Sequence, residues 1–257
     1  MDVENNTPPA TPKETRLEVV KMPDHKPVMT YIILGITVII YILQMVTFYW
    51  LNVDILAALG GKINNAILAG QLWRLFTPIL LHHQELFFHI LFNMYFLAVV
   101  GPRLEKFTNH LPFLLLYILA GFSGNVFSFL FSPNDSLGAS SSLYGLMGAQ
   151  MIFVLHNRSF LVDNGKAALQ NILMLIVINV AISFFFIAVD NWAHIGGLAG
   201  GTLFAWFGGP KLDLEEISFP RFKLVDARTW GERLLGATLV LLIFGGFAAL
   251  KITGIAF

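Results

Sequence analysis

The chain contains no cysteine and few charged residues. None of its 257 residues is a cysteine, which excludes disulfide bonds, thiol nucleophiles and cysteine-ligated metal sites but leaves the redox compartment undetermined. Charged residues make up 12% of the sequence, against roughly 25% in a soluble domain. Sixteen basic and sixteen acidic residues cancel, so the net charge indicates neither a nucleic-acid partner nor an acidic substrate.

Apolar residues take the place of the missing charge. They form 56% of the sequence and give a mean hydropathy of +0.70, which favours one membrane domain over soluble domains. Residues 1–27 are a polar exception. They contain five prolines and lack the short apolar core of a secretory signal, so we expect a mostly disordered cytoplasmic tail, with a short amphipathic stretch near residues 17–22.

Seven apolar segments are candidates for membrane-spanning helices, each of which needs roughly 20 apolar residues to cross a bilayer. The predicted spans are residues 28–50, about 86–101, 111–131, 140–155, 167–189, 192–208 and 234–250. They predict an all-α, polytopic membrane helix bundle. Its parts are a six-helix core over residues 28–209, a cytoplasmic linker over 210–232, and an added C-terminal transmembrane helix over 233–257.

Basic residues are distributed unevenly between the predicted loops. With the N-terminus inside, most Lys and Arg residues fall in inner segments, and only Lys62, Arg74 and Lys251 lie outside. Because Lys and Arg collect on the cytoplasmic side, we predict a multi-pass cell-membrane protein with a cytoplasmic N-terminus and an external C-terminus. The outer loop over residues 51–85 is rich in apolar residues, which predicts short helices lying partly in the membrane interface.

Three of the predicted spans carry unusual polar residues at one depth. The second span contains His89 and Asn93, the fourth begins at Ser140, and the sixth contains His194. All four lie near the outer ends of spans that run inward, and a rise of about 1.5 Å per residue keeps them within a turn or two of the outer boundary. Because ionisable groups at membrane depth are costly, this convergence predicts a functional site that opens to the outer face.

These side chains suit acyl transfer. A serine hydroxyl becomes a good nucleophile when a neighbouring base takes its proton, and His194 can be that base for Ser140 near neutral pH. His89 and Asn93 share one helix face, and their N–H groups, with the backbone N–H of Ser140, can stabilise a developing oxyanion. No acidic residue is clearly placed to complete a triad, so we predict a two-residue dyad.

The same residues also have structural interpretations. A serine in a membrane helix often bonds to the carbonyl one turn earlier or packs as a small residue, and an asparagine can bridge two helices. Ser140, Ser141 and Ser142 are adjacent, and helical geometry alone does not choose among them. A transporter is a further alternative, although polar groups at the bilayer midplane are not evident. A metal site built from His89 and His194 is another alternative, although no further ligand clearly joins these two histidines.

Four motifs of the sequence resemble those of the rhomboid family of intramembrane serine proteases. The matching segments are residues 138–148 (GASSSLYGLMG), 193–201 (AHIGGLAGG), 89–93 (HILFN) and 73–74 (WR). The resemblance extends over residues 28–208 and keeps the order of the family's motifs. A seventh span after the six-helix core is similar to the arrangement in many bacterial members.

The resemblance implies a role for each matching residue. The catalytic residues would be Ser140 as nucleophile, His194 as general base, and His89, Asn93 and the Ser140 amide as oxyanion hole. The supporting residues would be Tyr144, Gly138, Gly197 and Gly201. The structural residues would be Trp73, Arg74 and Glu105. In this scheme Tyr144 packs against the ring of His194, and the G-x-x-x-G spacing of the two later glycines lets the sixth span approach the fourth closely.

One position departs from the family's pattern. The glycine that usually follows the nucleophile is Ser141 here, and its side chain is expected to crowd the site. This departure is the one feature that favours the alternative function, a catalytically inactive rhomboid-like pseudoprotease that binds membrane client proteins. The remaining histidines match no part of the catalytic pattern and are interpreted as loop or interface residues: His25, His82, His83, His110 and His156.

An active member of this family would need no cofactor and no metal. Its partners would be the lipid bilayer and membrane proteins with a single transmembrane helix, not nucleic acid, and its oligomeric state is left open. A peptide bond inside a helix is hydrogen-bonded and sterically covered, so we expect substrates whose helix is weakened near the outer boundary. Phe184, Phe185 and Phe186 in the fifth span are predicted to form a lateral gate.

Overall fold

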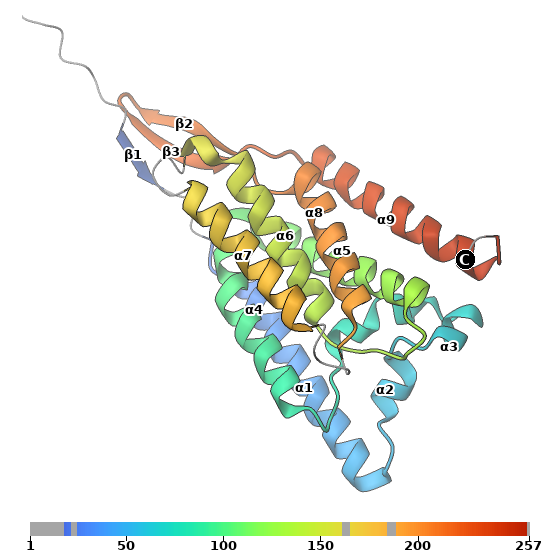
Figure 1. Cartoon of the computed structure of the whole chain (residues 1–257). Coiled ribbons are helices and arrows are strands. Elements are labelled where there is room, and N and C mark those ends of the chain that lie inside the picture. Colours follow the sequence, from blue (N-terminus) through green and yellow to red (C-terminus); the bar gives the residue numbers. More distant parts are fainter. Residues whose placement is uncertain (1–17, 22–24, 161–164, 184–188, 256–257) are drawn as a thin grey trace, which may run out of the picture.

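The computed structural model describes residues 18–21, 25–160, 165–183 and 189–255. Within these ranges seven long helices form one bundle (Figure 1): α1 (Val28–Leu51), α4 (Phe87–Thr108), α5 (His110–Phe131), α6 (Ser140–His156), α7 (Gly165–Ser183), α8 (Asn191–Gly208) and α9 (Trp230–Ile252). Each coincides with one predicted span, so the predicted all-α bundle is confirmed. The proposed gate residues Phe184, Phe185 and Phe186 lie outside the described residues.

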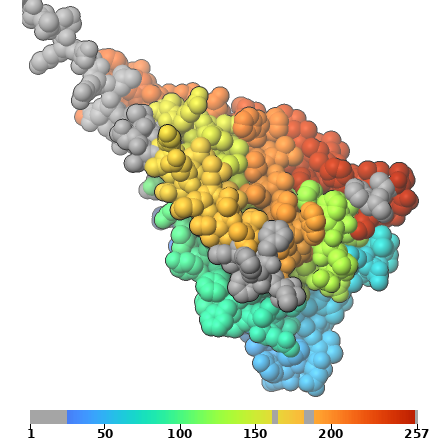
Figure 2. Space-filling model, viewed as in Figure 1, coloured from blue at the N-terminus to red at the C-terminus, as the bar shows by residue number. Residues whose placement is uncertain are grey.

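The helices differ in how they meet the membrane. Among the described residues, α1, α4, α5 and α9 are long and apolar enough to cross it alone, and α7 contains the shorter apolar stretch Gly165–Ala181. α6 and α8 are richer in small and polar residues, but both pack against α5 inside the bundle, so less of their surface must be apolar. Figure 2 shows α6, α7 and α8 beside one another on one face. The chain is a multi-pass membrane protein.

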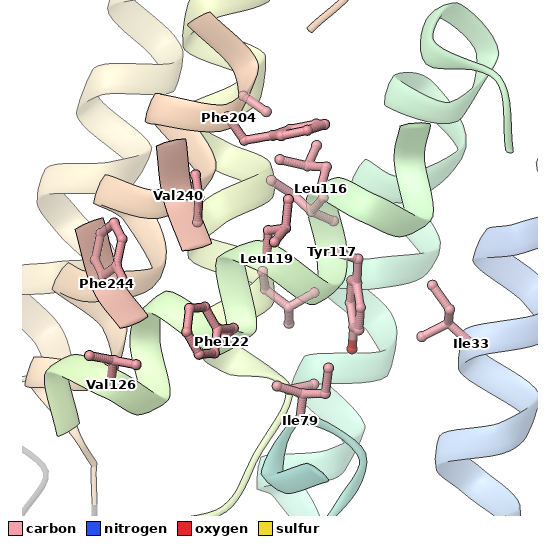
Figure 3. Packing of buried hydrophobic residues seen from close by; sticks show 14 of the residues in the cluster. Ile33, Ile79, Leu116, Tyr117, Leu119, Phe122, Val126, Phe204, Val240 and Phe244 are labelled. Carbon is pink, nitrogen blue, oxygen red and sulfur yellow. The ribbon is translucent and has the colours of Figure 1, made fainter. Parts of the chain in front are cut away.

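Helix α5 forms the centre of the packing. Its side chains Tyr117, Leu119 and Phe122 are buried, and Phe204 of α8 and Phe244 of α9 belong to the same cluster (Figure 3). Lipid tails are as apolar as these side chains, so removal from water does not drive one membrane helix onto another. Close van der Waals packing supplies the stabilisation instead, which makes the fit between helices decisive.

A three-stranded sheet is present that the sequence patterns did not predict. β1 (Glu18–Lys21) pairs in parallel with β3 (Arg221–Asp226), which pairs antiparallel with β2 (Leu212–Ser218). Residues 18–21, which fall in the short amphipathic stretch expected within a mostly disordered tail, form a strand, and the predicted linker contains a hairpin. Leu212 and Leu224 are the one buried residue of β2 and of β3, and such short, mostly exposed strands are not detected by a search for 20-residue apolar segments.

The loop between α1 and α4 lies at the end of the bundle opposite to the sheet (Figure 1). It contains four short helices, as predicted: α2 (Ile55–Gly60), α3 (Asn64–Leu68), η1 (Leu72–Leu75) and η2 (Thr77–Leu80). A buried arginine holds them together. The guanidinium of Arg74 donates hydrogen bonds of 2.7–2.8 Å to the side chain of Gln71 and to the carbonyls of Gly61 and Ala58. Trp73 donates to the carbonyl of Leu59, with its ring half-exposed.

At the other end of the bundle, a buried carboxylate joins α4 to the start of α1. The oxygens of Glu105 accept hydrogen bonds from the backbone N–H of Met29 (2.7 Å) and Thr30 (2.8 Å), from the Thr30 hydroxyl (2.6 Å), and from His110 Nδ1 (2.5 Å). The first N–H groups of a helix have no partner within it. Glu105 therefore caps α1 from a neighbouring helix.

Replacement of this carboxylate should destabilise the fold. We expect Glu105→Ala to lower the free energy of unfolding by roughly 3 kcal/mol, because it leaves several buried donors without an acceptor. Thermal unfolding of the purified protein in detergent measures the effect. Glu216→Ala, on the exposed surface of β2, is the control and should change the stability by less than about 0.5 kcal/mol. Equal unfolding temperatures for the two variants would contradict the capping role.

Candidate active site

The N-terminal ends of α4, α6 and α8 meet at the end of the bundle that carries the short loop helices (Figure 1). The polar residues predicted for the site lie in the first two turns of these three helices. His89 and Asn93 belong to α4, Ser140 is the first residue of α6, and His194 belongs to α8. Residues that are up to about a hundred positions apart in sequence are thereby brought to one level of the bundle.

Ser140 and His194 are in hydrogen-bond contact. His194 Nε2 lies 2.9 Å from Ser140 Oγ, and the ring of Tyr144, one turn further along α6, stacks on the imidazole with a centroid distance of 4.1 Å and an interplanar angle of 17°. His194 is 6% exposed. For the serine hydroxyl to donate to Nε2, the neutral ring must carry its proton on Nδ1. The stacked ring of Tyr144 restricts rotation of the imidazole.

The side chains of the two neighbouring serines pack against α5, and neither hydroxyl has a hydrogen-bond partner among the described residues. A Cβ atom placed on Gly124 of α5 would lie only 2.4 Å from the Cβ of Ser141, and one placed on Gly121 would lie 2.5 Å from the Oγ of Ser142. Both serine side chains therefore point toward α5. The expectation that Ser141 crowds the site is wrong, because the missing side chain of Gly124 leaves room for it.

Asp190 precedes α8, and its carbonyl accepts from the backbone N–H of His194 at 3.2 Å, but its carboxylate makes no hydrogen bond to the imidazole in the described part of the chain. Its Oδ1 accepts from the backbone N–H of Ala193 at 3.1 Å, and its Oδ2 accepts from the hydroxyl of Ser128 in α5. Nδ1 of His194 has no hydrogen-bond partner among the described residues. Asp190 thus fixes the beginning of α8 against α5, and the arrangement around His194 is that of a pair rather than a triad.

The segment leading into Ser140 runs beside the ring of His89. Gly138 has φ +144°, a backbone conformation that favours glycine, and a Cβ atom there would lie 2.9 Å from His89 Cε1 and 3.8 Å from Ser140 Oγ. The absence of a side chain at Gly138 therefore lets the imidazole ring of His89 lie close to Ser140. Since Ser140 is the first residue of α6, its backbone N–H has no acceptor inside the helix.

Asn93 contacts a histidine that the sequence analysis left outside the catalytic pattern. Its Nδ2 lies 3.0 Å from Nε2 of His82, in the loop before α4, and His82 is completely buried. The interpretation of His82 as an ordinary loop residue is therefore incomplete. The sequence shows only two adjacent histidines in an apolar loop, and the burial of one of them depends on how that loop packs against the helices.

Two glycines allow α8 to touch α6 backbone to backbone. A Cβ atom on Gly197 would lie 2.1 Å from the carbonyl oxygen of Ser141, and one on Gly201 would lie 2.4 Å from the Cα of Gly145. No side chain larger than hydrogen fits at either point without a shift of the helices. This close approach brings His194 within reach of Ser140.

The fold and site define a class: a multi-pass helical membrane protein with a serine held against a buried histidine at converging helix N-termini. The family model described as Rhomboid domain matches residues 69–211, more than half of the chain. The chain belongs to the rhomboid family.

Curated relatives extend this likeness over most of the chain. It is 33% identical over 235 residues to Rhomboid protease GluP of Bacillus subtilis (strain 168), covering 91% of this chain and 43% of that protein. It is 34% identical over 145 residues to the putative rhomboid protease YdcA of the same bacterium, covering 56% and 70%. RHOMBOID-like protein 1 of Arabidopsis thaliana is 41% identical over 134 residues, covering 52% and 33%. The chain spans less than half the length of GluP.

A methyl group on Gly197 should separate α8 from α6. We expect Gly197→Ala to lower the free energy of unfolding by about 1–3 kcal/mol, the usual cost of overpacking a tight contact. Thermal unfolding in detergent measures it. Gly246→Ala in α9 is the matched control, since nothing lies within 4 Å of its added Cβ and alanine favours the helix. If both variants unfolded at the wild-type temperature, the close contact of Gly197 with α6 would not be needed for stability.

Proposed function

We propose that the protein is an intramembrane serine endopeptidase that cleaves transmembrane segments near the outer membrane boundary. The observation that carries the proposal is the 2.9 Å contact between Ser140 Oγ and His194 Nε2 inside the bundle of a rhomboid-family chain. Two relatives that are named as rhomboid proteases support the same class of reaction. A hydroxyl held against a buried imidazole is the arrangement that activates a serine nucleophile.

The first half-reaction forms an acyl-enzyme. Ser140 Oγ attacks the carbonyl carbon of the scissile peptide bond while His194 Nε2 takes the hydroxyl proton, which gives a tetrahedral intermediate and an imidazolium. The intermediate collapses as the C–N bond breaks, and His194 returns the proton to the departing amine. The second half-reaction repeats these steps with water as the nucleophile, releasing the new carboxyl end and restoring the serine.

The negative charge of the tetrahedral intermediate requires hydrogen-bond donors. The backbone N–H of Ser140, the ring of His89 and the carboxamide of Asn93 are the proposed donors, and all three belong to the same converging helix ends. Donors held rigidly in a site that excludes most water stabilise such a charge strongly, and loss of one donor typically lowers kcat by about 10²–10³-fold.

The proposed substrates are membrane proteins with a single transmembrane helix, met within the lipid bilayer. A peptide bond in an intact helix is hydrogen-bonded and covered by side chains, so Ser140 can attack only where the helix has opened. Helix-weakening residues near the outer boundary lower the cost of this opening. Water needed for the second half-reaction would enter from the outer face, close to which the site is proposed to lie.

The proposed topology places the N-terminus and the β-sheet in the cytoplasm, and the short loop helices and the C-terminus outside. Residues 1–27 then form a cytoplasmic segment, 28–209 the catalytic core, 210–232 a cytoplasmic connection that includes the β2–β3 hairpin, and 233–257 the additional span. The concentration of Lys and Arg on the sheet side supports this orientation.

Labelling with a fluorophosphonate probe tests the activated serine without knowledge of the substrate. We expect the purified wild type and Ser141→Ala to be labelled, and Ser140→Ala and His194→Ala to lose labelling, because only Ser140 contacts the base. Thermal unfolding of each variant controls for loss of structure. A folded wild type that neither reacts with the probe nor cuts a model transmembrane substrate would instead favour a pseudoprotease that binds membrane clients.

The absence of cysteine makes the topology directly testable. A single cysteine introduced by Asp135→Cys, in the exposed α5–α6 connection, should react with a membrane-impermeant maleimide on intact cells. One introduced by Glu216→Cys, on exposed β2, should react only after permeabilisation. The opposite pattern would show that the chain is inserted with the inverse orientation.

A further inference from the structure

His82 lies buried between the two side chains proposed for the oxyanion hole. Its Nε2 is 3.0 Å from Nδ2 of Asn93, and its ring packs edge-on against the ring of His89 with centroids 5.2 Å apart and planes at 61°. The backbone N–H of Ala139, the residue before Ser140, points at the same Nε2 from 3.5 Å. One imidazole thus contacts both α4 side chains and the backbone that enters α6.

These contacts determine where the proton of His82 sits. A backbone N–H can only donate, so Nε2 must be the unprotonated, accepting nitrogen, even though the Ala139 contact is long for a hydrogen bond. Nδ1 has no hydrogen-bond partner among the described residues, so no contact on that side favours the other tautomer. An unprotonated Nε2 can accept from the NH₂ group of Asn93 but would repel its carbonyl oxygen. The tautomer therefore selects one of the two orientations of the carboxamide.

The backbone of His82 is itself held in place by α1. The side chain of Gln44 accepts from the His82 N–H at 3.0 Å and donates to the His82 carbonyl at 3.1 Å, and Gln44 is completely buried. Burial, with smaller contributions from His89 and His83, lowers the pKa of His82 to about 3. The ring therefore stays neutral near pH 7 and keeps its accepting nitrogen.

We infer that His82 is a positioning residue that turns the NH₂ group of Asn93, rather than its oxygen, toward the oxyanion of the tetrahedral intermediate. The NH₂ group has two hydrogens, of which one bonds His82 and the other is left for the substrate oxygen. A flipped carboxamide would put oxygen lone pairs in that place and repel the developing charge. This inference rests on the proposed function, because it assigns His82 a part in the same reaction.

Two isosteric substitutions separate the accepting nitrogen from the bulk of the ring. The end of a glutamine side chain reaches roughly the position of Nε2, whereas an asparagine ends near Nδ1. The assay is cleavage of a model transmembrane substrate by the purified protein. We expect His82→Asn to lower kcat by about 10-fold or more and to change KM by less than about 2-fold. The loss of kcat should be smaller than the roughly 10²–10³-fold loss that follows removal of an oxyanion donor. His82→Gln should recover most of kcat. His83→Ala, at the adjacent position, is the matched control and should retain wild-type kcat.

A double-mutant cycle identifies the route through Asn93. Asn93→Ala alone should lower kcat, and adding His82→Asn to it should lower kcat by less than about 2-fold further, because the carboxamide to be positioned is already gone. Multiplicative effects of the two substitutions would overturn the inference, and so would wild-type kcat in a folded His82→Asn variant. If His82→Asn fails to fold, His82→Leu, which fills the site without an acceptor, replaces it in the cycle.

The outcomes for the inference and for the proposed function are distinct. A wild type that cleaves substrate while His82→Asn keeps full kcat would remove the role of His82 and leave the serine protease intact. A folded wild type that neither cleaves substrate nor reacts with the fluorophosphonate probe would remove the proposed function and the inference together.

Discussion

The contact of α6 with α8, backbone against backbone, is the constraint on which the rest of the site depends. Within lipid, helices gain little from hiding apolar surface, so their association rests on close fit. Gly197 and Gly201 of α8 supply that fit against Ser141 and Gly145 of α6. A catalytic pair whose members stand on two helices must be held within about 0.5 Å of the productive geometry, so the two helices must be placed closely. The glycines therefore determine the chemistry of the site although they take no part in it.

Buried polar side chains fix the ends of the helices around this contact. Glu105 caps α1 from α4, Asp190 joins the start of α8 to Ser128, and Gln44 of α1 holds the backbone of His82. Where little water competes for donors and acceptors, such hydrogen bonds hold geometry well, and a missing partner is costly. Apolar packing fixes how the helices lie side by side, and these polar contacts fix how far each helix is shifted along its axis.

Hydropathy predicted the helices because the length of a span is imposed by the bilayer, not by tertiary contacts. The site residues could be listed from sequence because histidine and asparagine stand out in apolar segments. Sequence patterns did not give the rotation of each helix about its own axis. The preference of His194 for Ser140 over Ser141 depends on which side of α6 faces α8, and the room for Ser141 depends on Gly124 of α5. His82 and the sheet were missed for a related reason, since the burial of a loop and the pairing of strands of four to seven residues depend on segments distant in sequence.

The pairing of β1 with β3 also bears on how the molecule is made. β1 precedes all the helices, whereas β3 follows α8, so the complete six-helix core lies between the two strands. Because β3 is synthesised after α8, β1 has no partner in this sheet until the six long helices between the two strands have been made. Closure of the sheet therefore records that the core has been synthesised in full.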